Sequence, residues 1–177
     1  ALTTCALDAE RGRDYTLDAV NWVSGVKPFI FARNCNIGIA AAAPHDVILL
    51  NDDATLLTPE GFTALADAAA EHPDFGVVSA AITACVGNPA QKPRDQGLRE
   101  SAESVAFVCA YIPRRTIDAI GLLDESFSGG YGFEDNDYCR RLRNAGLKLG
   151  VHDGCIVEHG RLPSSFRSFG CRSISPR

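Results

Sequence analysis

The sequence lacks several features that mark common protein classes. Among its 177 residues there is no methionine, there is a single tryptophan, and no C-x-x-C pair occurs among the seven cysteines. No stretch approaches the roughly 18 consecutive apolar residues that a membrane-spanning helix needs. The net charge is −5, and no block of lysine and arginine gathers before Arg161. The sequence therefore argues against a transmembrane segment and against nucleic acid as a partner.

The cysteines and the missing methionine bear on compartment and completeness. An odd number of cysteines, most of them within apolar stretches, favours packed thiols in a reducing cytoplasm over a disulfide framework. We therefore expect a cytoplasmic protein, with peripheral attachment to the inner face of a membrane as the other option. Because the chain has no methionine even at its start, we also expect upstream sequence in the full protein. Residues 161–177 are rich in Ser, Arg and Pro, which predicts a loose tail.

The remaining residues, 1–160, are the size of one domain and alternate between strand-like and helix-like segments. This order predicts an α/β fold. Residues 46–50 are apolar without alternation, which is typical of a strand buried on both faces of a mainly parallel sheet. The segment patterns further predict strands at residues 2–7, 29–31, 75–82, 104–112, 147–151 and 155–158, and helices at residues 15–23, 36–43, 59–71, 113–120 and 134–145.

An acidic cluster, Asn51-Asp52-Asp53, follows the strand predicted at residues 46–50. In an open α/β sheet, ligands bind outside the carboxyl ends of the strands. A hard divalent cation binds there through one or two carboxylates, together with substrate phosphates and water. The alternative is a simple turn, which is the commoner use of Asn and Asp after a strand.

A second acidic pair, Glu134 and Asp135, opens the helix predicted at residues 134–145. Glycines precede it, and Tyr131 and Phe133 offer flat apolar faces to a ligand ring. A glycine loop that delivers carboxylates to a helix start is a way to place a catalytic base. The alternative is that both carboxylates only complement the positive end of the helix dipole.

His159 follows the strand predicted at residues 155–158, so it also stands at a strand end. A neutral imidazole there could complete a Mn²⁺-type coordination sphere. The alternative is an ordinary surface or core histidine, which is what we expect of the other three, His45, His72 and His152.

Taken in order along the chain, these segments resemble family 2 glycosyltransferases of the GT-A fold, in particular the rhamnosyltransferase-like branch. The stretch NIGIAAA at residues 36–42 resembles the N-x-G-i-a-x-A helix of the family, and DVILLNDDA at residues 46–54 resembles its strand and D-x-D-type metal motif. The segment GLLDESF at residues 121–127, continued by GYGFEDNDYCRR at residues 130–141, closely resembles the acceptor-side segment ending in an E-D pair. The stretch VEHG at residues 157–160 resembles the late histidine motif.

The chain departs from the family pattern in two places. The family opens with a strand and helix of the type V-S-V-I-I-P-x-Y-N, which holds the nucleotide base, and this chain has no such segment. The resemblance therefore implies a Rossmann-like GT-A domain truncated at its N-terminus, in which the residues around Asp8 resemble the second strand of the family. In addition, the metal motif reads Asn51-Asp52-Asp53, so only Asp53 is carried over as a metal ligand.

The resemblance implies an inverting, metal-dependent glycosyltransferase that moves a sugar from a nucleoside-diphosphate sugar to a hydroxyl of a glycan, lipid or small molecule. Asp53 and His159 would hold Mg²⁺ or Mn²⁺, and Asp135 would be the general base. The residues implied to bind donor or acceptor are Asp8, Asn36, Asp52, Tyr131, Gly132 and Glu134.

Two other functions stay open on the sequence. A domain without the first strand-helix unit could bind nucleotide or sugar without turnover. A metal-dependent nucleotidyl or phosphoryl transferase of similar topology would instead release pyrophosphate. A sheet that lacks its first strand would also expose an edge, which leads us to expect a homo-oligomer.

Overall fold

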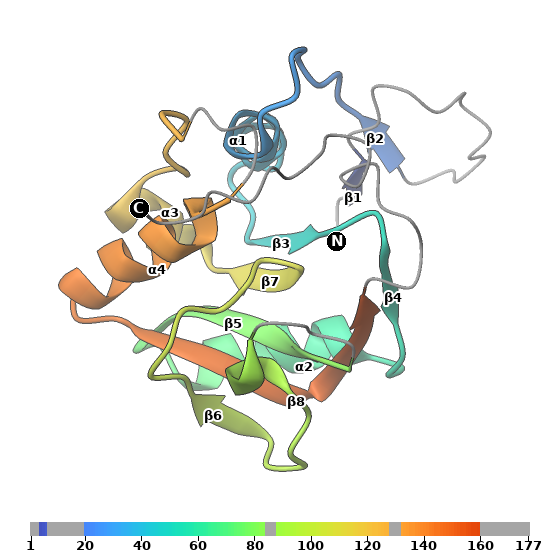
Figure 1. The fold of residues 1–177 in the computed structure, drawn as a ribbon, viewed down its shortest axis with the longest axis vertical. Coiled ribbons are helices and arrows are strands. Elements are labelled where there is room, and N and C mark those ends of the chain that lie inside the picture. The colour runs from blue at the N-terminus through green and yellow to red at the C-terminus, as the bar shows by residue number, and fades with distance from the viewer. Residues whose placement is uncertain (1–3, 7–19, 84–87, 128–131, 160–177) are drawn as a thin grey trace, which may run out of the picture.

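The computed structural model describes residues 4–6, 20–83, 88–127 and 132–159, which form a mixed α/β fold (Figure 1). The main sheet has six strands: β3 (Val47–Leu50), β7 (Cys109–Ile112), β5 (Phe75–Ile82), β8 (Lys148–His159) and β4 (Ala54–Leu56) in this order, with β6 (Leu98–Glu100) paired to β8. A separate parallel pair consists of β1 (Thr4–Ala6) and β2 (Val20–Trp22). The helices are α1 (Phe31–Ala41), α2 (Gly61–Glu71), α3 (Arg114–Ile120), α4 (Glu134–Asn144) and the 3₁₀ helix η1 (Pro89–Gln91).

The helices cover the two faces of the main sheet. One core packs α1, α3 and α4 against alternate residues of the central strands, such as Val77 on β5 and Val151 on β8. The other core packs α2 against the intervening residues of β5, such as Val78 and Ala80. Because successive side chains of a strand point to opposite faces, the uninterrupted burial of β5 follows from this three-layer arrangement. None of the helices in the described ranges combines the length and apolar character needed to cross a bilayer.

The prediction of a mainly parallel sheet is wrong. Within the described part of the main sheet, β5 and β8 are the parallel pair, whereas β7 runs antiparallel to both β3 and β5. The strands β4 and β6 also run antiparallel to β8. Parallel neighbours need a long, usually helical crossover. Between β5 and β7 the described chain instead forms η1, β6 and irregular backbone, so β7 can enter in the opposite direction.

The strand β3 is also less buried than the sequence predicts. Val47 is buried, but Ile48 and Leu49 are half-buried and Leu50 is 46% exposed. The reason is that β3 lies at the edge of the described sheet and pairs there with β7. An apolar run without alternation does not by itself distinguish an edge strand from a central one.

Several other predictions are confirmed, and several boundaries shift. The strand at residues 75–82 and the helices α3 and α4 lie where the sequence places them. Residues 147–151 and 155–158 join into the single strand β8, with a register irregularity opposite Ala80 and Ala81. The strand predicted at residues 29–31 is wrong, because α1 already begins at Phe31, and Val20–Trp22 is a strand where a helix was predicted.

The start of α2 differs because Thr58 has another partner. The sequence suggests Thr58 as the N-cap of a helix from residue 59. In the structure its Oγ1 accepts a hydrogen bond of 2.9 Å from the backbone N–H of Ile156 on β8. The helix therefore begins at Gly61, after Glu60 in a left-handed conformation with φ of 57° and without a side-chain cap bond.

Candidate functional site

The first half of the site is the pair Asp53 and His159, which the β4–β8 ladder brings together. Asp53 directly precedes β4, and His159 is the last residue of β8. Because the two strands are antiparallel and Ala54 pairs with His159, the side chains meet at the strand ends. Asp53 Oδ1 lies 3.1 Å from His159 Nε2, and both side chains are largely shielded from solvent. Asp53 and His159, the metal ligands expected from the sequence, thus lie in contact.

Asn51 joins this pair from the end of β3. Its side-chain Nδ2 lies 3.3 Å from His159 Nε2. Its backbone carbonyl accepts the N–H of Ala54 at 3.1 Å, which closes a turn around Asp52 and Asp53. The acidic cluster is therefore a turn, and the same turn presents Asp53 to His159. Asp52 is exposed at the turn.

The geometry of this half fits a divalent cation. Two ligand atoms at adjacent positions of an octahedral ion, each about 2.1 Å from it, lie about 3 Å from each other. Asp53 Oδ1 and His159 Nε2 are 3.1 Å apart. One carboxylate with one imidazole suits Mn²⁺, and a carboxylate with phosphate and water suits Mg²⁺. Within the described ranges, no three His, Cys, Asp or Glu side chains converge. Two protein ligands would therefore leave the other positions to substrate phosphate and water.

The second half of the site lies at the N-terminus of α4, on the wall of a cleft. The cleft has an empty volume of about 400 Å³, including space open to solvent. Asn51, from the first half, lies in the same wall as the carboxylates of α4. The complete lining is Phe31, Asn51, Ala106, Phe107, Val108, Gly132, Glu134 and Asp135.

Glu134 is 2% exposed, and its two carboxylate oxygens have different surroundings. Oε2 accepts a hydrogen bond of 2.7 Å from the backbone N–H of Gly132. Oε1 is buried without a partner, the single such side-chain oxygen or nitrogen in the described residues. An unsatisfied buried carboxylate oxygen is costly. Glu134 also lines the cleft, so a carboxylate with one unpaired oxygen lies beside the space that a ligand would occupy.

Asp135 follows Glu134 and has a more basic carboxylate than an ordinary aspartate. Burial raises the pKa of Asp135, and the neighbouring Glu134 charge adds to this. Backbone hydrogen bonds oppose the rise, including one of 2.8 Å from the N–H of Asn136 and a further one from Phe107. Burial outweighs these hydrogen bonds, and the resulting higher pKa suits a general base.

The turn before α4 holds its residues in unusual conformations. Gly132 has a φ of 120°, which is a region that residues with a Cβ rarely adopt. Phe133 has a φ of 76° although it is a bulky residue, and its side chain is 71% exposed. A non-glycine residue in this region typically costs about 1–3 kcal/mol and is commonest at functional sites. The turn thus stores strain directly before the carboxylate pair.

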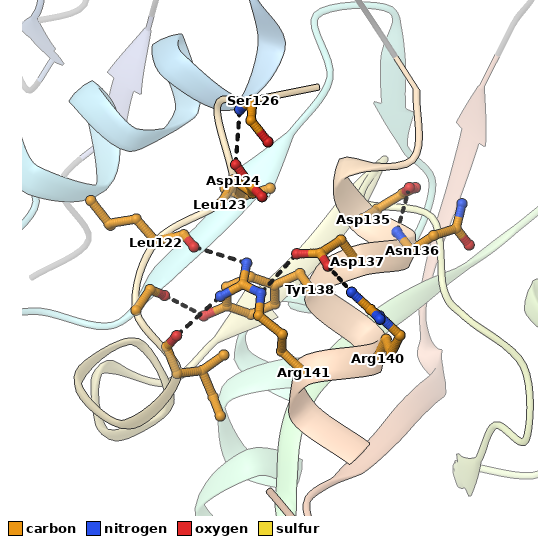
Figure 2. Close-up of polar contacts among 12 residues, drawn as sticks. Leu122, Leu123, Asp124, Ser126, Asp135, Asn136, Asp137, Tyr138, Arg140 and Arg141 are labelled. Carbon is orange, nitrogen blue, oxygen red and sulfur yellow. Dashed lines mark hydrogen bonds and ion pairs between the residues drawn. The ribbon is translucent and has the colours of Figure 1, made fainter. Parts of the chain in front are cut away.

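Behind the carboxylates, hydrogen bonds fix α4 to the segment at residues 120–122 (Figure 2). The Asp137 carboxylate accepts hydrogen bonds from Arg140 and Arg141 at 2.9 and 2.8 Å. Arg141 also donates to the backbone carbonyls of Ile120 and Leu122. Because two guanidinium groups offset the Asp137 charge, this residue contributes to holding the helix rather than to raising the basicity of Asp135.

The structure places Asn36 outside the cleft lining. The Asn36 amide donates to the carbonyl of Leu123 and accepts from its N–H, at 2.9 and 3.0 Å, and it also donates to Glu125. Asn36 is buried and has its hydrogen-bonding groups engaged. It ties α1 to residues 123–125, and its binding role stays a prediction. Asp8 and Tyr131 lie outside the described residues.

Sequence reasoning missed the apolar part of the cleft. Phe31, Phe107 and Val108 line it without belonging to any motif. In the sequence, Phe107 and Val108 read as part of a strand, and Phe31 as the end of another. Asn51 was visible as a polar residue at a strand end, which is the signal that could have assigned it a contact with His159.

No protein-family model and no curated protein sequence matches the chain. Its structure is similar to the crystal structure of GalNAc-T7 with UDP, GalNAc and Mn²⁺, with a TM-score of 0.65 and 14% sequence identity. The chain has a GT-A glycosyltransferase fold. The match covers 82% of this chain and 33% of the GalNAc-T7 chain, so the chain spans about a third of the length of that protein. At this identity, the similarity establishes the fold alone.

Proposed function

We propose that the chain is an inverting, metal-dependent glycosyltransferase domain that uses a nucleoside-diphosphate sugar and a hydroxyl acceptor. The observation that supports this most strongly is the position of Asn51. Asn51 contacts His159 through its side chain and lines the cleft together with Glu134 and Asp135. Asn51 thus links the Asp53–His159 pair, whose side chains are not part of the cleft lining, to the cleft that Glu134 and Asp135 line.

In this proposal, the first half binds the diphosphate. Asp53 and His159 would hold Mg²⁺ or Mn²⁺, and such an ion would stabilise, as a Lewis acid, the charge that develops on the leaving diphosphate. The bound groups in the GalNAc-T7 structure, UDP and Mn²⁺, support this reading.

The second half activates the acceptor. The Asp135 carboxylate removes the proton from the acceptor hydroxyl as its oxygen attacks the anomeric carbon, and the bond from that carbon to the diphosphate breaks. One displacement from the face opposite the leaving group inverts the configuration. The Asn136 N–H holds one Asp135 oxygen. Glu134 Oε1 would accept a hydrogen bond from a sugar hydroxyl and so orient it.

The motif resemblance further supports an assignment to family 2 and its rhamnosyltransferase-like branch. A cytoplasmic location agrees with the free thiols of the described cysteines Cys35, Cys109, Cys139 and Cys155. Self-association along β3 agrees with the exposed Leu50 on that edge strand.

A thermal-shift screen of nucleoside-diphosphate sugars tests the proposal. Each donor is added with Mn²⁺ or with a chelator, and hits are assayed for transfer to hydroxyl acceptors. We expect a rise in the melting temperature for a subset of donors that disappears with the chelator, followed by release of the nucleoside diphosphate on transfer. Donor binding without transfer to any acceptor would favour a binding module. Release of pyrophosphate would favour a nucleotidyl transferase.

A further inference from the structure

The side chain of Gln91, the last residue of η1, is completely buried behind the cleft. Its Oε1 accepts hydrogen bonds of 2.7 Å from the backbone N–H of Ala106 and from Nδ2 of Asn88. Its Nε2 donates to Ser79 Oγ at 2.6 Å and to the carbonyl of Ala106 at 3.1 Å. The amide of Gln91 thus binds both backbone groups of Ala106, which is a residue of the cleft wall.

Ala106 begins a three-residue segment that contacts both halves of the site. The carbonyl of Val108 accepts a hydrogen bond of 2.9 Å from the backbone N–H of Asn51, which extends the β3–β7 ladder to the metal-binding half. Phe107 lines the cleft together with Asp135, and its backbone lowers the pKa of the Asp135 carboxyl. Residues 106–108 therefore connect Gln91, Asp135 and Asn51 in succession, and we refer to them as the bridge.

Among the described strands, none pairs with Ala106 or Phe107 of the bridge, whereas Val108 is bonded to Asn51 at the end of β3. The sequence predicts a strand at residues 104–112, but in the structure it begins only at Cys109. Before Cys109, backbone groups form hydrogen bonds with side chains instead of with a neighbouring strand. The Ala106 carbonyl accepts from Gln91, and the Ser104 carbonyl accepts from Asn88. The position of Ala106, at the start of the bridge, consequently depends on the Gln91 side chain rather than on pairing with a neighbouring strand.

The connection that carries Gln91 is itself fixed from the other side. Arg99 donates hydrogen bonds to the carbonyls of Ala90 and Lys92, and it forms an ion pair of 2.6 Å with Asp153 on β8. Both side chains of this pair are nearly buried, at 10% and 5% exposure. These contacts anchor the connection that carries Gln91 to β8. The hydrogen bonds of the Gln91 amide in turn restrain the backbone of Ala106.

We propose that Gln91 is a positioning residue that sets the spacing between the Asp53–His159 pair and the Glu134–Asp135 pair through the bridge. An amide is required because Ala106 presents one donor and one acceptor to the same side chain. The catalytic consequence rests on the proposed function. The positional claim depends only on the hydrogen bonds of Gln91, Ala106 and Asn51.

The test compares Gln91→Met with the parent and with Arg114→Met. Methionine is close to glutamine in size and has no amide. Arg114 is a matched control because its guanidinium donates to two backbone carbonyls, those of His45 and Ile39, away from the cleft lining. Native-state hydrogen exchange of the Asn51 and Val78 amides reports the bridge and the central sheet, respectively. Turnover and Mn²⁺-dependent UDP binding are measured on the same samples.

We expect exchange at Asn51 to accelerate at least 10-fold in Gln91→Met relative to exchange at Val78, and to keep its parental ratio in Arg114→Met. We expect kcat to fall about 10-fold or more in Gln91→Met while UDP binding stays within about threefold. Parental exchange at Asn51, or an equal loss of kcat in Arg114→Met, would overturn the proposal. If the parent transfers no sugar, the proposed function fails, and the exchange ratio still decides the positional claim.

A milder variant covers the case in which Gln91→Met does not fold. Ser79→Ala removes one partner of the Gln91 amide and leaves both bonds to Ala106 available. We expect a smaller acceleration of exchange at Asn51, about two- to fivefold, again relative to Val78. A uniform acceleration at both amides would show a general loss of stability and would overturn the positioning role.

Discussion

His159 Nε2 lies 3.1 Å from Asp53 Oδ1, at the first paired position of the β4–β8 ladder. The strand register alone brings these side chains together, so neither needs a bound group to be in place. We expect Asp53→Asn to weaken Mn²⁺-dependent binding of a nucleoside diphosphate about 10-fold or more, because the amide replaces a charged metal ligand. Isothermal titration with and without Mn²⁺ measures this. The control is Asp118→Asn, which removes the same charge from an exposed position on α3. Equal nucleotide affinity in the two variants would refute a ligand role for Asp53.

Glu134→Gln should act on acceptor binding more than on turnover. The Gly132 N–H needs an acceptor, so the glutamine oxygen will take that bond and its NH₂ group will occupy the place of the free Oε1. The position then donates where it formerly accepted. We expect the acceptor KM to rise more than kcat falls, as measured by initial rates over an acceptor series. A loss confined to kcat would instead give Glu134 a direct part in proton transfer.

The acidic limb of the pH–rate profile should report Asp135. A general base acts only when deprotonated, and burial raises the pKa of Asp135. We therefore expect kcat/KM to fall, as the pH is lowered, at a pH above the usual aspartate value of about 3.9. Profiles are to be recorded with a saturating metal concentration. A limb at or below the ordinary aspartate value would contradict the raised pKa.

The same raised pKa makes a prediction for stability. The folded protein holds its proton on Asp135 more tightly than the unfolded chain, so folding is penalised by this residue once the pH exceeds the unfolded pKa. The penalty is complete above the folded pKa and absent below the unfolded one. We expect Asp135→Asn to be more stable than the parent at pH 7, with a difference that shrinks as the pH is lowered. Urea denaturation at several pH values tests this, and a less stable variant at pH 7 would contradict it.

The Arg99–Asp153 pair should be a main stabilising contact of the connection at residues 88–97. Burial opposes ionisation of Asp153, but hydrogen bonds from the Gln96 N–H and Arg99 lower its pKa overall. The ion pair therefore contributes its full stabilisation of the folded state above the pKa of Asp153 in the unfolded chain. This stabilisation is lost as the pH falls through the lower pKa that Asp153 has in the folded protein. At neutral pH, Asp153→Asn should cost about 3 kcal/mol of unfolding free energy, because Arg99 is left nearly buried without its counter-charge.

The control for this pair is Asp74→Asn. Asp74 pairs with Lys148, and both side chains are about half exposed, at 50% and 45%. Exposed ion pairs contribute little because solvent screens them. Chemical denaturation of both variants at neutral pH should show a clear loss for Asp153→Asn and a small one for Asp74→Asn. Equal losses would contradict the view that burial of the Arg99 pair makes it important.

Phe133→Gly tests the strain before α4. Phe133 has a φ of 76° and is 71% exposed, so glycine relieves an unfavourable backbone conformation and removes little buried surface. We expect a gain in stability of about 1 kcal/mol, since the relief exceeds the extra entropy of glycine in the unfolded chain. Thermal denaturation measures it. A loss of stability would mean that the Phe133 side chain makes contacts more important than the strain.

Much of the site could be predicted from the sequence because its polar residues stand at element ends. Asp53 and His159 follow apolar runs, and Glu134 and Asp135 begin a helix whose periodicity is clear. Such signals are local, so they remain usable even where other predicted elements of the fold are wrong. The contact of Asp53 with His159, however, follows from the β4–β8 register, and β4 is too short to be recognised in the sequence.

Strand direction and the bridge could not be predicted. The direction of β7 depends on a connection without a crossover helix, which no residue pattern of β7 itself reveals. Residues 104–108 have the composition of a strand, and only the contacts of Gln91 with Ala106 show why they do not form one. The contacts of Asn36 with Leu123 could not be predicted for the same reason, since the two residues are distant in the sequence.

The most direct test of the two-half site measures donor binding and sugar transfer side by side in the parent, Asp53→Asn and Asp135→Asn. In Asp135→Asn, Mn²⁺-dependent binding of the sugar nucleotide should stay near the parental affinity while transfer falls by about 10²–10⁴, the usual effect of losing a general base. In Asp53→Asn, binding itself should be lost. Near-parental transfer in Asp135→Asn, or an equal loss of binding in both variants, would contradict a site built from a metal-binding half and a base half.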